Sequence, residues 1–553
     1  MSGKRTFVWT TRHESPDHER YGNNERAELR ERPSSEREHK YRRRGRSDTS
    51  ARPMSSASNS RATSAVAMWP NAAPLDVRAL TRELGKARSL HELLSLQERH
   101  GDGFNSFNLS AFWSKFKKLP REEPGELQSC LAPVCEQTVR MLPELDARKV
   151  ATVAHVFAMS GLVGTYPYTG VWEALEEAAR RGLGGFDPQG LSNTAWAFAK
   201  VGHEAPALFE AISAQAVSRG LSDFKEQHLS NTAWAFATAR HEAPALFEAI
   251  SAQAVRRGLG DFNAQDLSNT AWAFATARHE APALFEAISA QAMNQGLSDF
   301  KEQALSNTAW AFATVRHEAP ALFEVISAEA VRRGLGDFNE QDLSNTAWAF
   351  ATARHEAQAL FEAISAQAMR RGLSGFNAQD LSNTAWAFAT ARHEAPALFE
   401  AISAQAVRRG LGDFKEQELS NTAWAFATAR HEAPALFEAI SAQAMRRGLG
   451  DFKKQHLSNT AWAFATARHE APALFEAIST EAVRRGLGDF NEQGLSNTAW
   501  ALAVFDTPSA GELFRTASFT TRCAHFAASF SREGLCQLHQ WSLWREERGE
   551  SWP

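Results

Sequence analysis

The chain has 553 residues, 43% of them hydrophobic, so it is long enough to bury a substantial core. Its formal net charge of −4 argues against a broadly basic nucleic-acid binder, so any contact with phosphates must come from local patches. Cys130, Cys135, Cys523 and Cys536 form neither a metal-ligand spacing nor a disulfide framework, and no apolar run is as long as a membrane span. We therefore expect a soluble protein from a reducing compartment, with no membrane contact.

Residues 1–74 are rich in Arg, Glu and Ser and poor in aliphatic residues, which is typical of a disordered tail. The basic run Lys40–Arg46 fits an RNA contact, a nuclear address or a solvated tail. Residues 49–74 lack acidic side chains and are similar in composition to an organelle transit peptide, although they are internal. If translation begins at Met54, this stretch becomes the N-terminus, so we expect a tail with a targeting segment.

A repeat dominates the rest of the chain, because the motif LSNTAWA occurs nine times with a period of 38 residues. This period predicts an all-α solenoid of about nine to eleven helical hairpins over residues 150–506, beginning with a degenerate copy at Val150–Ala158. We expect residues 75–149 and 507–553 to form the N-terminal and C-terminal helical caps. The motif copies begin at Leu191, Leu229, Leu267, Leu305, Leu343, Leu381, Leu419, Leu457 and Leu495.

Each repeat predicts two helices with a break between them. In the copy at Leu229 we expect a first helix from about Glu226 to Arg240 and a second that starts at Pro244, because proline fits the first turn of a helix. We expect the second helix to run to about Arg257 and Gly258 to form a left-handed C-cap.

The start of the first helix differs between repeats. Asn263 and Asn339 stand at the cap position with an acidic residue three positions later, which is a good capping signal. Where lysine stands instead, as at Lys225, the aspartate two residues earlier, Asp223, is the alternative cap.

The motif asparagine is the leading candidate for ligand contact. It lies opposite the Leu/Phe face of the first helix, beside the motif tryptophan, and packed helices repeat every ~10 Å. Amides and aromatic rings suit hydrogen bonding and stacking with single-stranded bases. Alternatively, the asparagine ties neighbouring repeats together and the tryptophan belongs to the core. The base-facing candidates are Asn193, Asn231, Asn269, Asn307, Asn345, Asn383, Asn421, Asn459 and Asn497.

Arginines end both helices of the repeat. Repeated along the array, they make stripes of positive charge suited to RNA phosphates. Cations also favour helix C-termini through the helix dipole, so a purely structural role is the alternative. Arg240 ends the first helix, and the backbone-contact candidates at the end of the second are Arg256, Arg257, Arg332, Arg333, Arg408, Arg409, Arg446 and Arg447.

The residue before each motif leucine varies in an otherwise uniform array. A constant asparagine cannot distinguish different bases, so any sequence code must lie at such positions. The alternative is an exposed site that drifted after recent duplication. The candidates for variable specificity are His228, Asp266, Ala304, Asp342, Asp380, Glu418 and His456.

Catalytic, cofactor-binding and metal-binding residues are not predicted. The chain lacks a glycine-rich phosphate loop, an HExxH motif and a nucleophile elbow. Repeated histidines such as His241 and His279 come from different units spaced by ~10 Å, whereas zinc needs several ligands at ~2 Å. We therefore expect a protein that is not an enzyme and carries no cofactor.

The unit LSNTAWAFATA resembles the octotricopeptide repeat and the helical repeats of the FAST kinase-like, RAP-domain proteins of algae and protists. Ala87–Lys118 is similar to the N-terminal region of such proteins, and QLHQWSLW at Gln537–Trp544 is similar to the segment before their RAP domain. The resemblance implies sequence-selective binding of organellar RNA. Only Arg545–Pro553 follow that segment, too few for a RAP domain, so we expect either a truncated gene or a protein without that domain's nuclease-like role.

The leading hypothesis is a solenoid that binds single-stranded organellar transcripts selectively and acts in their processing, stability or translation. We expect it in the mitochondrial matrix or a plastid rather than in the cytoplasm or nucleus. At one base per repeat it would cover about nine to eleven nucleotides. The alternative, which suits the near-neutral charge, is a scaffold that holds an extended peptide or a helix of a protein partner in the same groove.

Overall fold

The computed structural model of the chain describes residues 76–120, 124–164, 166–487, 490–507, 513–514 and 517–549. The tail predicted over residues 1–74, with its basic run and transit-like stretch, lies outside the described residues. Throughout the described part the regular elements are helices and no strand occurs, which confirms the all-α solenoid. None of these helices combines the length and apolar character needed to cross a bilayer.

The chain divides into two compact units. Among the described residues, the second unit contains those up to Leu145 together with 166–171, and the first contains 146–164 and everything from Trp172 onward. The division at residues 145 and 146 lies close to the start of the array that the sequence predicts at residue 150.

The second unit is a small, irregular helical bundle. Its core includes Trp113, which is fully buried and donates its indole N–H to the Thr138 hydroxyl at 2.9 Å. Asn108 joins two helices by donating to the Val77 carbonyl at 3.0 Å. Its elements are α1 (Val77–Lys86), α2 (Leu90–His100), η1 (Gly101–Gly103), α3 (Ser106–Phe116), α4 (Pro124–Met141) and η2 (Leu142–Glu144).

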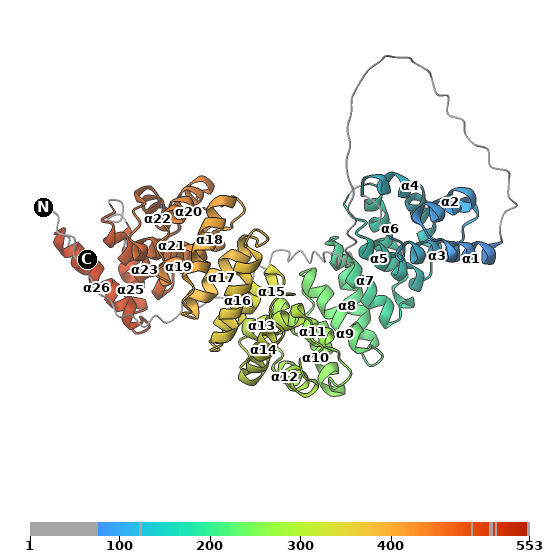
Figure 1. Ribbon diagram of the computed structural model, residues 1–553, viewed down its shortest axis with the longest axis horizontal. Coiled ribbons are helices and arrows are strands. Elements are labelled where there is room, and N and C mark those ends of the chain that lie inside the picture. The colour runs from blue at the N-terminus through green and yellow to red at the C-terminus, as the bar shows by residue number, and fades with distance from the viewer. Residues whose placement is uncertain are drawn as a thin grey trace, which may run out of the picture. The chain divides into compact units, whose positions relative to one another are not determined.

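The first unit alternates two kinds of helix, which follow one another in chain order (Figure 1). We call the helices that carry the LSNTAWA motif A helices and the helices that follow them B helices. The A helices are α7 (Pro188–Val201), α9 (Glu226–Thr238), α11 (Ala264–Ala277), α13 (Glu302–Thr314), α15 (Glu340–Thr352), α17 (Ala378–Thr390), α19 (Glu416–Thr428), α21 (Lys454–Ala467) and α23 (Glu492–Val504). The B helices are α8 (Pro206–Arg219), α10 (Pro244–Arg257), α12 (Pro282–Gln295), α14 (Pro320–Arg333), α16 (Gln358–Arg371), α18 (Pro396–Arg409), α20 (Pro434–Arg447) and α22 (Pro472–Arg485).

Helices outside the regular repeats extend the array at both ends. α5 (Ala147–Ser160) packs on α7 as an earlier A helix and is followed by α6 (Tyr168–Arg181) and η3 (Leu183–Gly185). After the last repeat come α25 (Ala517–His525) and α26 (Arg532–Glu547), and α26 packs on α23 as a further A helix. These helices occupy the places where the sequence predicts atypical terminal repeats.

Consecutive A helices lie in close backbone contact, whereas consecutive B helices approach each other at far fewer positions. Alanines make the closer approach possible, because Ala233, Ala235 and Ala237 of α9 are all buried. A layer whose helices lie closer together forms the inner side of a curved stack. The A helices therefore provide the inner face of the array and the B helices its outer face.

The repeat core follows the predicted apolar pattern. Leu229 and Phe236 of an A helix and Leu246 and Ile250 of a B helix are all buried. Burial of each such side chain contributes roughly 1.5–3 kcal/mol, before the loss of conformational entropy is counted. A stack of repeats that bury the same residues is therefore held together by many similar contacts rather than by one central core.

Aromatic contacts join each repeat to the next. Phe247 of a B helix packs edge-on against Phe274 of the following A helix, with ring centroids 5.0 Å apart, and His279 lies against both rings. His279 also approaches the Glu248 carboxylate at 3.6 Å. The repeated histidines are thus inter-repeat packing residues, and the described part of the chain contains no group of three His, Cys, Asp or Glu that could hold a metal ion.

α9 begins at Glu226 as predicted, but its C-terminal end and the turn after the B helix differ from the prediction. α9 ends at Thr238, and Arg240 adopts the left-handed conformation with φ of 53°. Gly258, predicted as a left-handed cap, instead has φ of 80° and ψ of 159°. Only glycine adopts that region readily, so its lack of a side chain is still required. Asp223 is not the N-cap of α9, because the helix begins after Lys225 without a side-chain capping bond.

Candidate nucleic-acid interface

A stripe of uncharged polar and aromatic side chains follows the inner face of each A helix. In α9 it consists of Gln227, Asn231, Trp234 and Thr238, whose spacing places them on one side of a helix. Gln227 is exposed, Asn231 and Thr238 are half-buried, and Trp234 is buried. The stripe recurs in each successive A helix, so amide groups run along the whole inner face.

The predicted base-facing asparagines all lie on this stripe but differ in exposure. Asn193, Asn231, Asn269, Asn307, Asn345 and Asn383 are half-buried, whereas Asn421, Asn459 and Asn497 are buried. The Asn497 carboxamide oxygen accepts a hydrogen bond from Gln537 of α26 at 3.0 Å. Asn497 therefore ties two neighbouring helices together through a side-chain contact, while six of the nine asparagines keep part of their surface open.

The motif tryptophans form rows of neighbouring rings. In the six described Trp–Trp pairs the centroids lie 6.2–6.4 Å apart and the planes are tilted by 31–36°. His155 of α5 adds a ring next to Trp196, and Trp500 donates its indole N–H to Gln540 of α26. Trp386 is only 2% exposed. Most of the indole rings are thus packing residues that lie beneath the amide side chains.

The paired arginines of the B helices separate into two roles. The second of each pair turns back to the loop before the A helix of the same hairpin: Arg409 donates to the Phe376 carbonyl at 2.9 Å and Arg447 to the Gly412 carbonyl at 3.1 Å. Arg257 and Arg333 make the equivalent contact with Phe224 and Phe300. These four predicted phosphate ligands therefore close the hairpin, because their guanidinium donors satisfy carbonyls that otherwise lack partners.

The first arginine of each pair is exposed. Arg446 donates to the Gln443 side chain at 2.8 Å, and Arg256 and Arg408 are bonded in the same way to Gln253 and Gln405. Arg332 forms a bidentate pair with Glu329, whose pKa falls to about 2 chiefly because of that hydrogen bond. These arginines lie on B helices, in the outer layer, away from the amide stripe.

Six of the seven variable positions before the motif leucine take part in helix capping, and Ala304 is the exception. The Asp380 carboxylate accepts the Asn377 backbone N–H at 3.1 Å, while Asn377 accepts the Asp380 N–H at 2.9 Å. Asp266 and Asp342 repeat this reciprocal arrangement, and His228, Glu418 and His456 accept the N–H of the preceding lysine. Ala304 makes no such contact and is buried, as are Asp266, Asp342 and Asp380. The buried members offer no open edge to a base.

Burial has electrostatic consequences at these positions. It raises the pKa of Asp342 and of Asp380 to about 6, because each charged carboxylate loses solvation between two A helices. Asp380 also accepts the Ser344 hydroxyl of the preceding A helix at 3.0 Å. For the same reason burial lowers the pKa of His456 to about 4.

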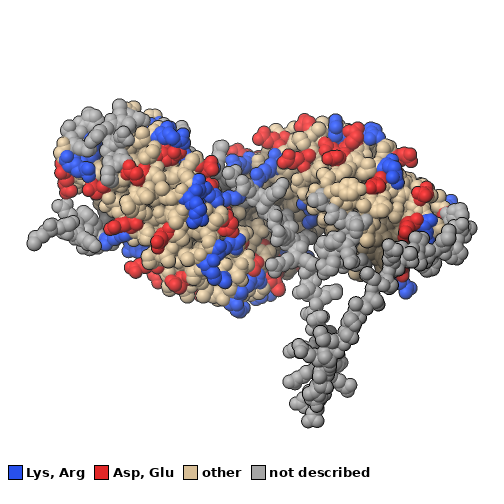
Figure 2. All heavy atoms as spheres, turned by 90° about the horizontal axis from the view of Figure 1, so that it is seen from above, with Lys and Arg blue, Asp and Glu red and all other residues tan. Residues whose placement is uncertain are grey.

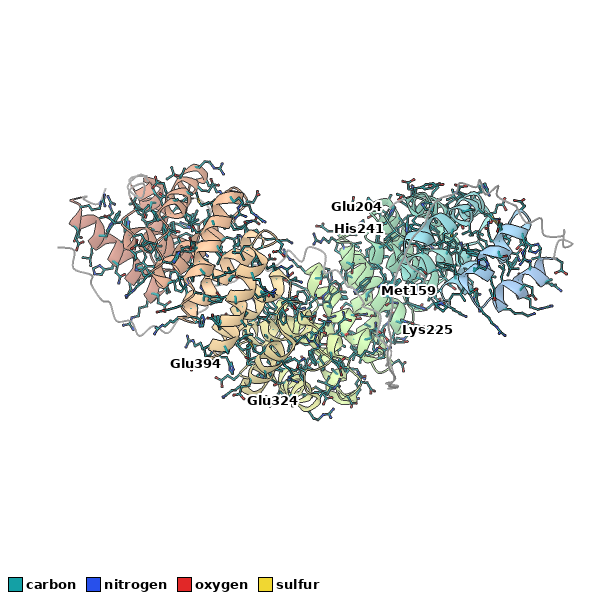
Figure 3. The ribbon with its side chains drawn as sticks, turned by 45° about the horizontal axis from the view of Figure 1, so that its top comes forward. Met159, Glu204, Lys225, His241, Glu324 and Glu394 are labelled. Carbon is teal, nitrogen blue, oxygen red and sulfur yellow. The ribbon has the colours of Figure 1, made fainter. Side chains whose placement is uncertain are left out.

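Charged residues mark the two rims of the A layer. Lys225 lies at the start of α9 and His241 at its opposite end, and His241 lies on the same side of the array as Glu204 of the preceding loop (Figure 3). Arg240 and the lysines at the helix starts, such as Lys225 and Lys301, are exposed along these rims. On the surface seen in Figure 2, Lys and Arg are interspersed with Asp and Glu and no single sign dominates.

Helical spacing puts Gln227 on the same face as Asn231, although it is not among the residues predicted to contact a base. In the structure Gln227 is exposed, whereas Asn231 is half-buried. The left-handed backbone of Arg240 gave no direct sequence signal, although Gly202 occupies the same place in the first repeat with φ of 66°.

A family model described as RNA-editing substrate-binding complex 6 protein matches residues 189–370 and 299–542. Together the two matches cover more than half of the chain. The chain belongs to this family. No curated protein matches it. The matched residues run from α7 to α23 and extend into α26, so the repeats described above carry the likeness to this RNA-associated family.

Proposed function

We propose that the protein is a non-enzymatic RNA-binding subunit of an RNA-editing complex and holds single-stranded RNA along the inner face of its A helices. The observation that carries the proposal is the continuous amide stripe on the inner face of a chain from the RNA-editing substrate-binding complex 6 family. Amides are both donors and acceptors, so each repeat offers a group that can pair with a base edge.

Half-buried asparagines and exposed glutamines would share base contact in this proposal. The tryptophan row limits how deeply a base can enter, because its rings fill the space between neighbouring A helices. The uniform stripe supports a contact of similar strength at every repeat. Selectivity among sequences would then come from stacking and backbone fit more than from a base code.

The test is RNA binding by a protein in which Asn269, Asn307 and Asn345 are all changed to alanine. Each lost hydrogen bond costs roughly 0.5–1.5 kcal/mol, so we expect affinity for a 12-nucleotide single-stranded RNA to fall about tenfold or more. Fluorescence anisotropy over a salt series measures it, and Asn294→Ala on the outer helix α12 is the matched control. Absence of binding by the native protein at low salt would overturn the proposal.

The proposal also extends to the cellular compartment of the protein and to the families that it resembles. The helical repeat, the RNA-related family and the resemblance to octotricopeptide and FAST kinase-like proteins all support a role in processing or stabilising mitochondrial transcripts. A plastid location is the other organellar option. Crosslinking of the protein to RNA in cells, followed by sequencing, would identify the transcript and thereby the compartment.

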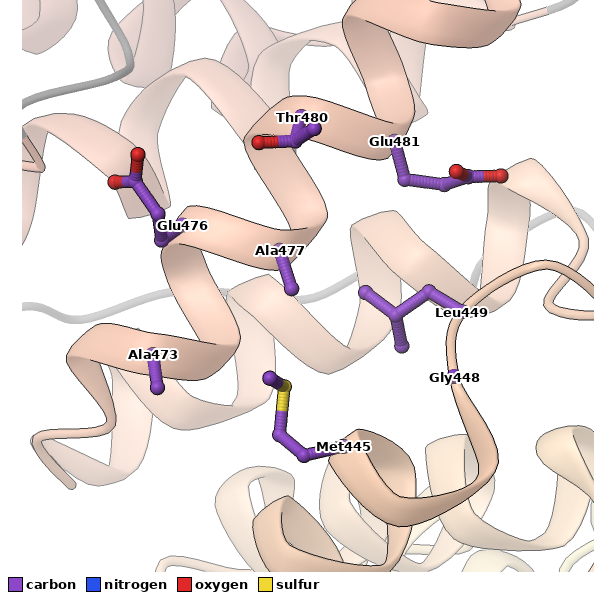
Figure 4. A pocket seen from close by; sticks show the side chains of 8 residues that line it. All are labelled: Met445, Gly448, Leu449, Ala473, Glu476, Ala477, Thr480 and Glu481. Atoms are coloured by element: carbon purple, nitrogen blue, oxygen red, sulfur yellow. The ribbon is translucent and has the colours of Figure 1, made fainter.

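The outer face favours a second role, contact with a protein. One apolar side chain is exposed on each B helix from α8 to α20: Val217, Val255, Met293, Val331, Met369, Val407 and Met445. A groove of about 450 Å³ lies between α20 and α22, lined by Met445, Ala473 and Ala477 (Figure 4). Exposed apolar rows of this kind mark interaction surfaces. Pull-down with and without RNase tests this role, because a direct protein partner stays bound after the RNA is digested.

A further inference from the structure

A row of arginines in left-handed backbone conformation follows the end of the A helices. Their φ values are 52–55°, a region that side-chain-bearing residues rarely adopt. All of them are exposed. Within the described residues the row consists of Arg240, Arg278, Arg316, Arg354, Arg392, Arg430 and Arg468.

Glycine would fit this position without strain. Gly161 after α5 and Gly202 after α7 take the same place with φ of 67° and 66°. The fold therefore accepts glycine, yet each repeat from α9 to α21 carries arginine. Arginine strains the backbone here, whereas glycine would not. Strain that is kept in this way points to a functional role of the side chain, so we expect the arginine to do more than end the helix.

The position of the row suits a polyanion. Each arginine follows an A helix whose inner face carries the amide stripe, and the A helices are the closely packed layer. Successive guanidinium groups are therefore spaced by the helix-packing distance of ~10 Å along one rim of that stripe. Glu242 and its equivalents, two residues later, are also exposed and keep the net charge of each loop low. Any attraction for a phosphate therefore comes from the single arginine and not from the loop as a whole.

The opposite rim has a related pattern. Lys225, Lys301, Lys415 and Lys453 stand at the N-cap, where none makes a side-chain capping bond and where asparagine caps other repeats well. A cation at a helix N-terminus also opposes the helix dipole. Both rims of the amide stripe thus carry basic residues at positions where local structure favours another residue.

We propose that the seven left-handed arginines form a phosphate track that holds the backbone of single-stranded RNA along the amide stripe. This inference rests on the proposed function, because it assigns the backbone contacts of the same bound RNA. The track ends at α23, where Asp506 takes the equivalent place with φ of 48° and accepts the Trp544 indole N–H at 3.0 Å and a hydrogen bond from Arg548.

The test replaces Arg278, Arg354 and Arg430 together with glycine in the full-length protein. Because glycine suits this backbone, we expect the same or a higher unfolding midpoint, while affinity for a 12-nucleotide RNA falls about tenfold or more at moderate salt. The slope of log K against log salt should decrease by about 0.7 per lost contact, or about 2 in total. Replacement by asparagine, which also tolerates this conformation, is the second variant.

Two controls separate the possible outcomes. Arg256, Arg408 and Arg446, changed together to glutamine, remove the same charge from the outer layer and should leave the affinity nearly unchanged. If the glycine and asparagine variants bind RNA with native affinity and slope, the phosphate track is wrong while the proposed function stands. If the native protein binds no RNA at low salt, both fail. Equal losses in the outer-layer control would also overturn the track, because they would indicate a general charge effect.

Discussion

At the scale of single residues, the position before the motif leucine shows how a functional pattern and a structural one differ. In the sequence alone, variation at Asp342, Asp380 and His456 suggests a code for RNA bases. In the fold these side chains lie at the third position of the A helix, where they accept backbone N–H groups of the cap. At these positions aspartate and histidine are thus alternative capping residues with different charge, whereas Ala304 supplies no cap.

The ionised form of Asp380 destabilises the fold, because its pKa rises to about 6 in the folded protein while its ordinary value is 3.8. The folded protein therefore loses stability as pH rises from about 4 through 6, and the loss persists above 6. Asp380→Asn keeps the acceptor oxygen and removes the charge, so we expect a gain of roughly 1–3 kcal/mol at pH 7.5. Denaturant unfolding at pH 7.5 and pH 4 measures it. A gain of equal size at both values would contradict the prediction.

At the scale of elements, the hairpin depends on two backbone turns that need unusual conformations. The turn after each A helix from α9 to α21 holds arginine in left-handed backbone, and the turn after each B helix holds glycine with positive φ and extended ψ. The second turn brings the chain to the next A helix. The second arginine at the end of the B helix, such as Arg409, donates to a carbonyl in the loop before the A helix of the same hairpin. The geometry of the repeat is therefore determined at its turns as much as in its core.

Gly334→Ala tests the turn after α14, where φ is 72° and ψ is 158°. A residue with a side chain costs roughly 1–3 kcal/mol in this region, so we expect lower stability by that amount. Gly336→Ala in the same loop is the matched control, because its added methyl group meets nothing within 4 Å and its φ is not positive. Thermal unfolding compares the two, and equal effects would show that the loop tolerates either conformation.

Lys301→Asn tests the start of α13. Lys301 makes no side-chain capping bond, whereas Asn339 in the next repeat accepts the Asp342 N–H at 2.8 Å. We expect the new cap to stabilise the helix by about 1 kcal/mol. Lys301→Gln removes the charge without supplying a cap and should change the stability little. Amide hydrogen exchange at the first turn of α13 reports the gain locally, and unchanged protection would refute it.

At the scale of the whole molecule, the array behaves as a chain of nearest-neighbour contacts. Phe247 and Glu248 contact the following repeat through Phe274 and His279, and α10 also packs on the neighbouring B helices α8 and α12. Nearly identical interfaces mean that repeats are interchangeable. The terminal helices α5 and α26 differ in sequence and extend the A layer at its two ends.

Deletion of residues 264–301 should therefore leave a folded array, because Asn263 then precedes Glu302 at an equivalent N-cap. Circular dichroism should show unchanged helicity per residue, and the shortest RNA bound at full affinity should decrease by a constant step. Deletion of half that length, residues 264–282, is the control, since it joins the wrong helices and should prevent folding of that region. An unchanged RNA length requirement would argue against contact at every repeat.

The sequence by itself determined the solenoid, the number and order of its repeats and most of its core. A fixed period with one apolar pattern leaves few other ways to bury Leu229, Phe236 and Ile250. It also placed the asparagines on a common stripe, because helical spacing depends only on residue number.

Only the tertiary structure decided which polar groups remain available. The close approach of the A helices buries Asp380 and Asn459, and the fold of the hairpin commits Arg409 to the Phe376 carbonyl. The left-handed state of Arg240 belongs to the turn itself, where the His241 N–H donates to the Phe236 carbonyl at 3.1 Å. The contacts of Asp380 with Ser344 and of Arg409 with Phe376 instead join segments more than thirty residues apart in the chain. The repeat pattern, which specifies each unit alone, does not contain such distances.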